Sequence, residues 1–129
     1  MKDEKERQKD LKVRTKEFAL QIIRLYSSLP KTTETQVLGG QLLKSGTSVG
    51  AHYHEAQRAK SNADFISKIE GALQELDETI YWLELLEASG FITTERLNSI
   101  NQESNELIAI FVSIVKAVKS RSKSKNYEQ

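Results

Sequence analysis

The sequence predicts an all-α fold, an antiparallel up-down-up-down four-helix bundle, from three observations. Apolar residues recur at helical spacing along the chain, and no alternating pattern of useful length predicts a strand. The 129 residues suffice for one domain with a core of about four helices. Apolar residues make up 38% of the chain, with a single Pro and six Gly, which is typical of a soluble helical protein. We expect residues 11–119 to form the bundle.

The first helix is predicted from about Leu11 to Leu29, because its apolar residues share one face. Pro30 cannot donate a backbone hydrogen bond and disfavours helical geometry at the residue before it, so the helix ends there. Residues 1–10 are highly charged and offer few apolar anchors, so we expect a frayed N-terminus. The predicted stripe consists of Leu11, Phe18, Ile22, Leu25, Tyr26 and Leu29, widened by Ala19 and Ile23.

Thr33, with Gln36 three residues later, predicts a capping box that opens the second helix. Four glycines follow, and each weakens an isolated helix by roughly 0.8–1 kcal/mol relative to Ala. Their number favours close packing of a neighbouring helix, and a break in the helix at residues 39–40 is the alternative. The glycines are Gly39, Gly40, Gly46 and Gly50, and the predicted buried stripe is Leu38, Leu42, Gly46, Val49, Tyr53 and Ala56.

A third helix is predicted from a cap at Ser61, followed by Asp64, to about Ser89. Gly90 stands where a left-handed residue ends a helix, and Phe91 follows it as a Schellman motif requires. The predicted core stripe is Phe65, Ile69, Leu73, Leu76, Ile80 and Leu83.

Three apolar residues of this helix, Tyr81, Trp82 and Leu85, are expected on the side opposite the core, at about 100° per residue. A second apolar face on a helix that already supplies a core indicates a partner. We therefore predict that Tyr81, Trp82 and Leu85 form an oligomer interface.

The fourth helix is predicted to begin at Thr93 or Thr94, with Glu95 favourably placed in its first turn. Its apolar stripe is unusually broad, which indicates contacts on two sides. Residues 120–129 are expected to be a basic disordered tail, because they offer no apolar group to the core. The stripe consists of Leu97, Ile100, Leu107, Phe111, Ile114 and Val118, broadened by Ile108, Ile110 and Val115.

The net charge of +1 conceals a strong asymmetry along the chain. Residues 1–60 carry 12 Lys and Arg against 7 Asp and Glu, residues 61–111 carry 2 against 10, and residues 112–129 carry 5 against 1. One interpretation is that helices of opposite sign attract their neighbours. The other is a basic surface for RNA or DNA. Its candidate residues are Lys44, His52, Arg58, Lys60, Lys119 and Arg121, with Tyr53 as a possible stacking group that also lies on the predicted core stripe.

The only histidines, His52 and His54, are two residues apart and so lie about 200° apart on a helix, where they do not readily share one metal ion. Residues 54–58 begin like a zinc-protease helix, but Arg58 stands where the second His is required. No catalytic triad order, phosphate-binding Gly loop or dinucleotide fingerprint is present. We predict no enzymatic activity, no metal and no cofactor, and a site at His52, His54 and Glu55 is the third hypothesis.

The chain has no Cys, no apolar N-terminal segment and no apolar run of the roughly 18 residues that a membrane span needs. Absent cysteines are compatible with a reducing compartment. The expectation is a cytoplasmic protein without a membrane partner.

From Phe18 to about Val115 the chain resembles the 23S rRNA intervening-sequence protein family. The matching segments in order are 41–51 (QLLKSGTSVGA), 55–56 (EA), 64–65 (DF), 75–79 (ELDET), 81–83 (YWL) and 89–92 (SGFI).

The resemblance implies an up-down-up-down bundle that assembles into a homo-oligomer, with a five-fold ring as the known arrangement. It implies no known enzymatic activity. The family is named for genes within inserts of ribosomal RNA genes, and a distantly similar bundle works with a reverse transcriptase and nucleic acid. We therefore expect a non-enzymatic homo-oligomeric scaffold or interaction protein, and the alternative is an RNA- or DNA-binding accessory protein that uses a basic face of the oligomer.

Overall fold

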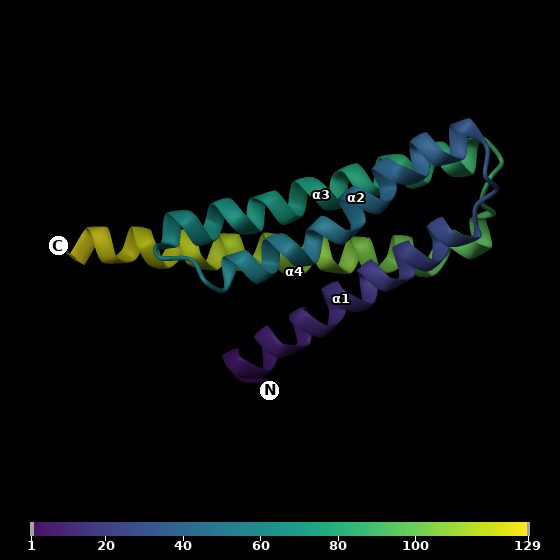
Figure 1. Ribbon diagram of the computed structural model, residues 1–129. Coiled ribbons are helices and arrows are strands. Elements are labelled where there is room, and N and C mark those ends of the chain that lie inside the picture. The colour runs from purple at the N-terminus through teal and green to yellow at the C-terminus, as the bar shows by residue number, and fades with distance from the viewer. Residues whose placement is uncertain (1, 129) are drawn as a thin grey trace.

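The computed structural model describes the backbone of residues 2–128 and the side chains of residues 2–123. It contains α1 (Glu4–Ser28), α2 (Thr33–Ala56), α3 (Asn62–Ala88) and α4 (Thr94–Glu128), joined by short turns. Successive helices run in opposite directions (Figure 1). Within the described residues every element is a helix, so the predicted all-α four-helix bundle is confirmed.

Side-chain pairs confirm the alternating direction of the helices. Gly39 of α2 packs on Tyr26 of α1, whereas Gly50, further along α2, packs on Thr15, earlier in α1. From α3 to α4, Lys119 Nζ lies 3.4 Å from Glu70 Oε1, and α3 begins beside residue 122. In each of these helix pairs, residues later in one helix contact residues earlier in the other, so the two helices run in opposite directions.

Local capping residues fix most helix ends. The N-cap of α2 is Thr32, whose hydroxyl accepts a hydrogen bond from the Thr35 backbone N–H, so the predicted cap at Thr33 is off by one residue. Ser61 caps α3 as predicted, with its Oγ 3.0 Å from the Asp64 backbone N. At the other end of α3, Gly90 has φ +83. This left-handed residue allows the two Schellman hydrogen bonds, so that prediction is also confirmed.

Two helix ends differ from the expectation. α1 begins at Glu4, because the Asp3 side chain accepts a hydrogen bond from the Glu6 backbone N–H and caps the helix. α4 continues to Glu128, and the Lys and Arg residues near its end are good helix formers that suit the negative end of the helix dipole. The segments expected to be frayed and disordered are thus helical, while Met1 and Gln129 lie outside the described residues.

The buried residues lie mostly on the predicted apolar stripes, but on α3 and α4 the buried face is turned slightly about the helix axis. On α3 the buried residues include Ala72 and Thr79, whereas Leu73 is only half-buried. Thr79 tolerates burial because its hydroxyl donates to the Ser45 hydroxyl at 2.9 Å. On α4, Val115 takes the buried place expected for Ile114. The large, fully buried side chains are Phe18, Ile22, Leu25, Leu42, Val49, Ile69, Leu76, Leu83, Leu86, Leu97, Leu107 and Phe111.

The close approach of α1 to α2 explains why α2 carries glycine at positions 39 and 46. A Cβ at Gly46 would lie 2.7 Å from Ile22 Cγ1, and one at Gly39 would lie 2.8 Å from Tyr26 Cδ2. The helix runs without interruption through residues 39–40, so the alternative of a break is wrong. Gly40 is different, because a Cβ there would meet nothing within 4 Å.

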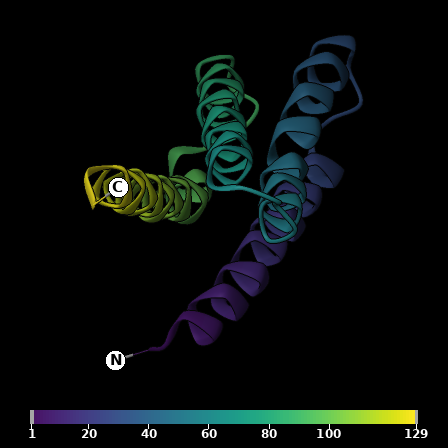
Figure 2. The same cartoon turned by 90° about the vertical axis from the view of Figure 1, so that its left-hand side faces the viewer.

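The bundle is open on one side. α2 packs extensively against both α1 and α3, and α4 packs mainly against α3, whereas α1 and α4 make few contacts. Figure 1 shows α1 diverging from α4 toward the N-terminus, and in Figure 2 the N-terminal end of α1 lies apart from α4. The N-terminal half of α1 and the C-terminal half of α4 therefore face each other across an incompletely filled space.

Candidate functional site

A cleft of about 1280 Å³ lies between α1, the α2–α3 turn and α4. Its floor is apolar, and the part supplied by α4 combines branched and small side chains. Small side chains allow another backbone to approach closely. The apolar and small residues of the floor are Leu11, Val13, Ala56, Phe65, Ala109, Ile110, Ser113, Ile114, Ala117 and Val118.

The rim of this cleft is basic. Two residues predicted from the sequence as parts of a basic surface, Lys60 and Arg121, meet here although 61 positions separate them. The Asn62 amide donates to the Ser122 hydroxyl at 3.1 Å, which holds the α2–α3 turn beside α4. The basic lining residues are Lys2, Arg7, Lys9, Arg14, Lys60 and Arg121, against the acidic Glu4 and Asp10.

One ion-pair cluster joins α1 to α4 beside the cleft. The Arg14 guanidinium donates to both oxygens of Glu103, at 3.1 Å and 2.5 Å, and its Nη2 lies 3.3 Å from a Glu106 oxygen. These hydrogen bonds, first the one to Glu103, raise the pKa of Arg14. A bidentate pair is directional, so it fixes the spacing between the two helices at this point.

The other basic candidates lie elsewhere. His52 packs against Gly71 of α3, with Nε2 3.8 Å from Glu75 Oε1 and a buried Nδ1 that has no hydrogen-bond partner among the described residues. Burial chiefly raises the pKa of Glu75, aided by Glu78, while His52 and Lys44 lower it. Lys44 and His52 thus belong to the α2–α3 face and not to the cleft.

Lys119 and Arg58 also fall outside the cleft lining. Lys119 pairs with Glu70 of α3, and Arg58 is exposed on the turn after α2.

Tyr53 is buried, its hydroxyl donates to the Gln8 carbonyl at 3.3 Å, and burial raises its pKa to about 12. The stacking role considered for Tyr53 is therefore wrong, because its ring is held in the core.

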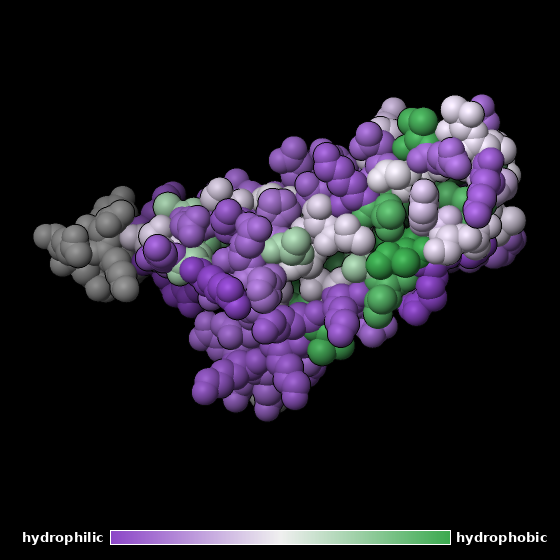
Figure 3. Space-filling model, in the orientation of Figure 1, coloured by the Kyte–Doolittle hydropathy of each residue, from purple (hydrophilic) through white to green (hydrophobic). Residues whose placement is uncertain are grey.

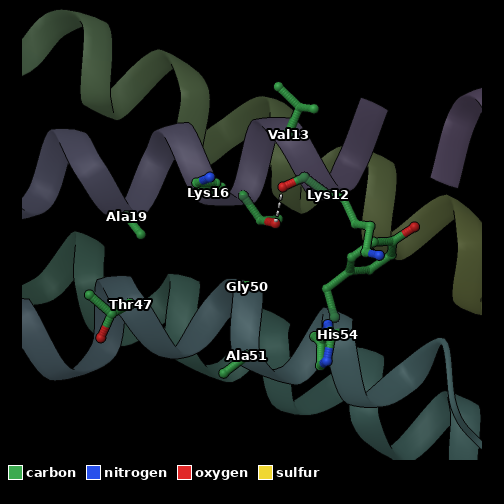
Figure 4. Close-up of a pocket in the computed structure, with 10 residues that line it drawn as sticks. Lys12, Val13, Lys16, Ala19, Thr47, Gly50, Ala51 and His54 are labelled. Atoms are coloured by element: carbon green, nitrogen blue, oxygen red, sulfur yellow. Dashed lines mark hydrogen bonds between the residues drawn. The ribbon is translucent and has the colours of Figure 1, made fainter. Parts of the chain in front are cut away.

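The two histidines lie on different sides of α2. His54 is exposed in a second groove of about 440 Å³ between α1 and α2, opposite Lys12 and Lys16 (Figure 4). His52 instead faces α3, where it packs against Gly71. Among the side chains that the structure describes, no group of three His, Cys, Asp or Glu is arranged to hold a metal ion. Val13, labelled in Figure 4 as a lining residue of this groove, also lines the α1–α4 cleft.

The predicted interface residues of α3 are in three different environments. Tyr81 is 53% exposed, and Leu85 is half-buried. Trp82, expected opposite the core, is half-buried and packs against the core, with its ring 5.2 Å from that of Tyr81. Asp77, Glu78 and Glu84 are exposed on the same helix.

Other apolar surface lies at the end of the bundle near the α1–α2 turn (Figure 3). Ile23 of α1, which we expected in the core, is 40% exposed, and Val37 of α2 is 60% exposed. In the described part of the chain, no helix is long and apolar enough to span a membrane.

Sequence reasoning missed the cleft floor on α4. Ala109, Ser113 and Ala117 do not belong to the predicted apolar stripe of the fourth helix. Ile110 was predicted only to broaden that stripe. The available signal was the segment 107–115 (LIAIFVSIV), which contains no charged residue on any side of the helix. A helix that is apolar all round is normally buried all round.

Comparison with known proteins identifies a family, and the similar solved structures include the one described below. The profile of the 23S rRNA-intervening sequence protein family matches residues 8–113. The crystal structure of a protein with unknown function from the S23 ribosomal protein family of Bacteroides thetaiotaomicron is 45% identical, with a TM-score of 0.78. The match covers 82% of this chain and 98% of that one. No protein with a curated description matches.

Proposed function

Because the chain belongs to the 23S rRNA-intervening sequence protein family, we propose that it is a non-enzymatic, homo-oligomeric four-helix-bundle scaffold. Its surface area carries the proposal. The protomer exposes 8370 Å², whereas a compact monomer of 14.6 kDa exposes about 6,900 Å². Part of the excess of about 1,500 Å² belongs to the end of α4 that projects beyond the bundle (Figure 1), and the open side of the bundle adds surface that a protein–protein contact can bury.

The uncharged segment of α4 supports the same proposal. Leu107, Phe111 and Val115 face the core, whereas Ile110 and Ile114 line the open cleft. Five residues of this segment are apolar without being fully buried in the protomer, which is costly in water. Contact with further copies would cover them. A five-fold ring, the arrangement that the family resemblance implies, would be one way to form such contacts.

Light scattering on the purified protein tests this function. We expect a molar mass that is a multiple of 14.6 kDa. Tyr81→Glu should reduce the mass, because it places a charge at an exposed aromatic position of the expected interface. Gln41→Glu, an exposed change on α2, serves as the control for charge alone. A wild-type protein of 14.6 kDa at micromolar concentration would refute the proposal.

Binding of RNA or DNA is the second candidate, favoured by the meeting of Lys60 and Arg121 on one rim. Repetition of the rim in an oligomer would strengthen weak phosphate contacts. For duplex DNA, the logarithm of the affinity should fall with the logarithm of salt by about 0.9 per phosphate contact. Filter binding at two salt concentrations tests this. Lys60→Ala with Arg121→Ala should weaken binding, whereas Lys44→Ala, outside the cleft, should not, and absence of binding at low salt removes this candidate.

A further inference from the structure

We propose that the cleft between α1 and α4 receives the outer face of α3 from a second copy of this chain. We define the outer face of α3 by its exposed or half-exposed residues Asp77, Tyr81, Glu84 and Leu85. This inference rests on the self-assembly proposed above and names the surface on which one copy docks. The contact joins two different surfaces, so the copies join head to tail.

The cleft has the size and floor that a helix requires. A helix about 10 Å across would fill a volume of 1280 Å³ with about three turns. Val13 is 52% exposed on one wall, and Ile110 and Ile114 are half-buried on the other. Between them, Ala109, Ser113 and Ala117 are exposed and small, so an incoming helix can approach the α4 backbone closely.

The basic residues at the rim of the cleft favour an acidic helix as the partner. Six basic side chains line the cleft against two acidic ones, and once the ion pairs Lys2–Asp10 and Arg14–Glu103 are set aside, four basic side chains remain against Glu4, namely Arg7, Lys9, Lys60 and Arg121. The rim residues Lys60 and Arg121 are exposed, and no ion pair is formed by either of them with any side chain that the structure describes. Complementary charge on a partner would orient it and accelerate its docking.

The outer face of α3 is an acidic helical face of this chain. α3 carries seven Asp and Glu against the single basic Lys68, which pairs with Glu55. Among the described side chains, Asp77, Glu78 and Glu84 have no ion-pair partner in the protomer. Tyr81 and Leu85 are four residues apart and form one apolar ridge between these carboxylates.

Charge also decides between head-to-tail and face-to-face contact. Two copies of α3 packed face to face would place like charges of Asp77 and Glu84 against one another, which is unfavourable. A basic cleft and an acidic ridge on one chain instead complement each other between copies. Because each copy then offers one cleft and one ridge, the contact repeats and closes into a ring or extends as a filament.

Cysteine cross-linking tests the proposal, since the chain has no cysteine of its own. Ala117→Cys and Tyr81→Cys are expressed separately and together, and treated with a short bismaleimide. We expect a cross-linked dimer only in the coexpressed sample. Asn105→Cys, exposed on α4 outside the cleft, replaces Ala117→Cys in the control and should give none. Dimers from Tyr81→Cys alone would indicate face-to-face contact and overturn the proposal.

Blocking the cleft gives an independent result. Ser113→Arg with Ala117→Arg changes two side chains that are exposed in the protomer, so circular dichroism should stay helical while the particle mass falls to 14.6 kDa. Asn105→Arg should leave the mass unchanged. If wild type assembles and the blocked variant assembles equally, the cleft is not the docking surface and only this inference fails. If wild type is a monomer, the proposed function itself fails.

Discussion

The pair Gly46→Ala and Gly40→Ala isolates the cost of separating α1 from α2. A Cβ at Gly46 would lie 2.7 and 2.8 Å from the two γ carbons of Ile22 and 3.1 Å from its Cβ, whereas a Cβ at Gly40 would meet nothing within 4 Å. Ile22 is fully buried and β-branched, so it cannot rotate away and the helices must move apart.

The magnitude follows from two opposing terms. Replacing Gly by Ala inside a helix favours folding by about 0.5–1 kcal/mol at both positions. Overpacking at Gly46 costs about 1–3 kcal/mol and does not occur at Gly40. The gain in helix propensity is common to both variants and cancels when their free energies of unfolding are compared. Gly46→Ala should therefore be less stable than Gly40→Ala by about 1–3 kcal/mol.

Thermal unfolding of both variants at one protein concentration measures this difference. Equal concentration matters because assembly makes the midpoint depend on it. In a chain of this size each kcal/mol corresponds to roughly 3–5 °C. Gly40→Ala should melt above wild type and Gly46→Ala below Gly40→Ala. Equal midpoints for the two variants would refute the account of close α1–α2 packing.

Three further predictions concern helix capping, pH and the α1–α4 ion pair. Thr32→Ala should lower the free energy of unfolding by about 1 kcal/mol because it removes the N-cap of α2, and Thr33→Ala should change it little in urea denaturation. Burial raises the pKa of Glu75, so the folded chain holds this proton to higher pH than the unfolded chain, and stability falls as pH rises from the unfolded value through the folded one. Glu75→Gln should therefore flatten this fall in unfolding measured across the acid-to-neutral range, and an unchanged pH profile would contradict it. Arg14→Lys should cost about 0.5–1 kcal/mol, since it replaces the bidentate contact with Glu103 by a single point charge, and no loss in urea denaturation would show that the contact adds nothing.

Local signals in the sequence were sufficient for most of the fold. Ser61, Gly90 and Pro30 act on neighbouring backbone, so their positions alone mark helix ends. The rotation of the α3 core toward Ala72 and Thr79 was not predictable in this way, because it depends on where α2 and α4 lie around the helix. The buried hydroxyl of Thr79 has two partners, the Glu75 carbonyl of its own helix at 2.7 Å and the Ser45 hydroxyl of α2 at 2.9 Å, and the second depends on how the two helices pack.

The candidate site was predicted less completely, since it depends on how far apart two helices stand. Charge selected six basic residues as candidates, and of these only Lys60 and Arg121 line the cleft, whereas His52 lies beside Glu75 of α3. Their binding of nucleic acid stays a prediction. Spacing along the chain does not reveal that α1 diverges from α4. The uncharged run 107–115 was the one feature in the sequence that indicated an uncovered surface there.

Sedimentation equilibrium of the wild-type protein over a dilution series tests self-assembly most directly. The account predicts particles whose mass is a whole multiple of 14.6 kDa at the highest concentration, with any loss of mass on dilution following mass action. A mass of 14.6 kDa at every concentration would contradict it, because the apolar residues of α4 and the exposed Tyr81 would then remain uncovered in the working protein.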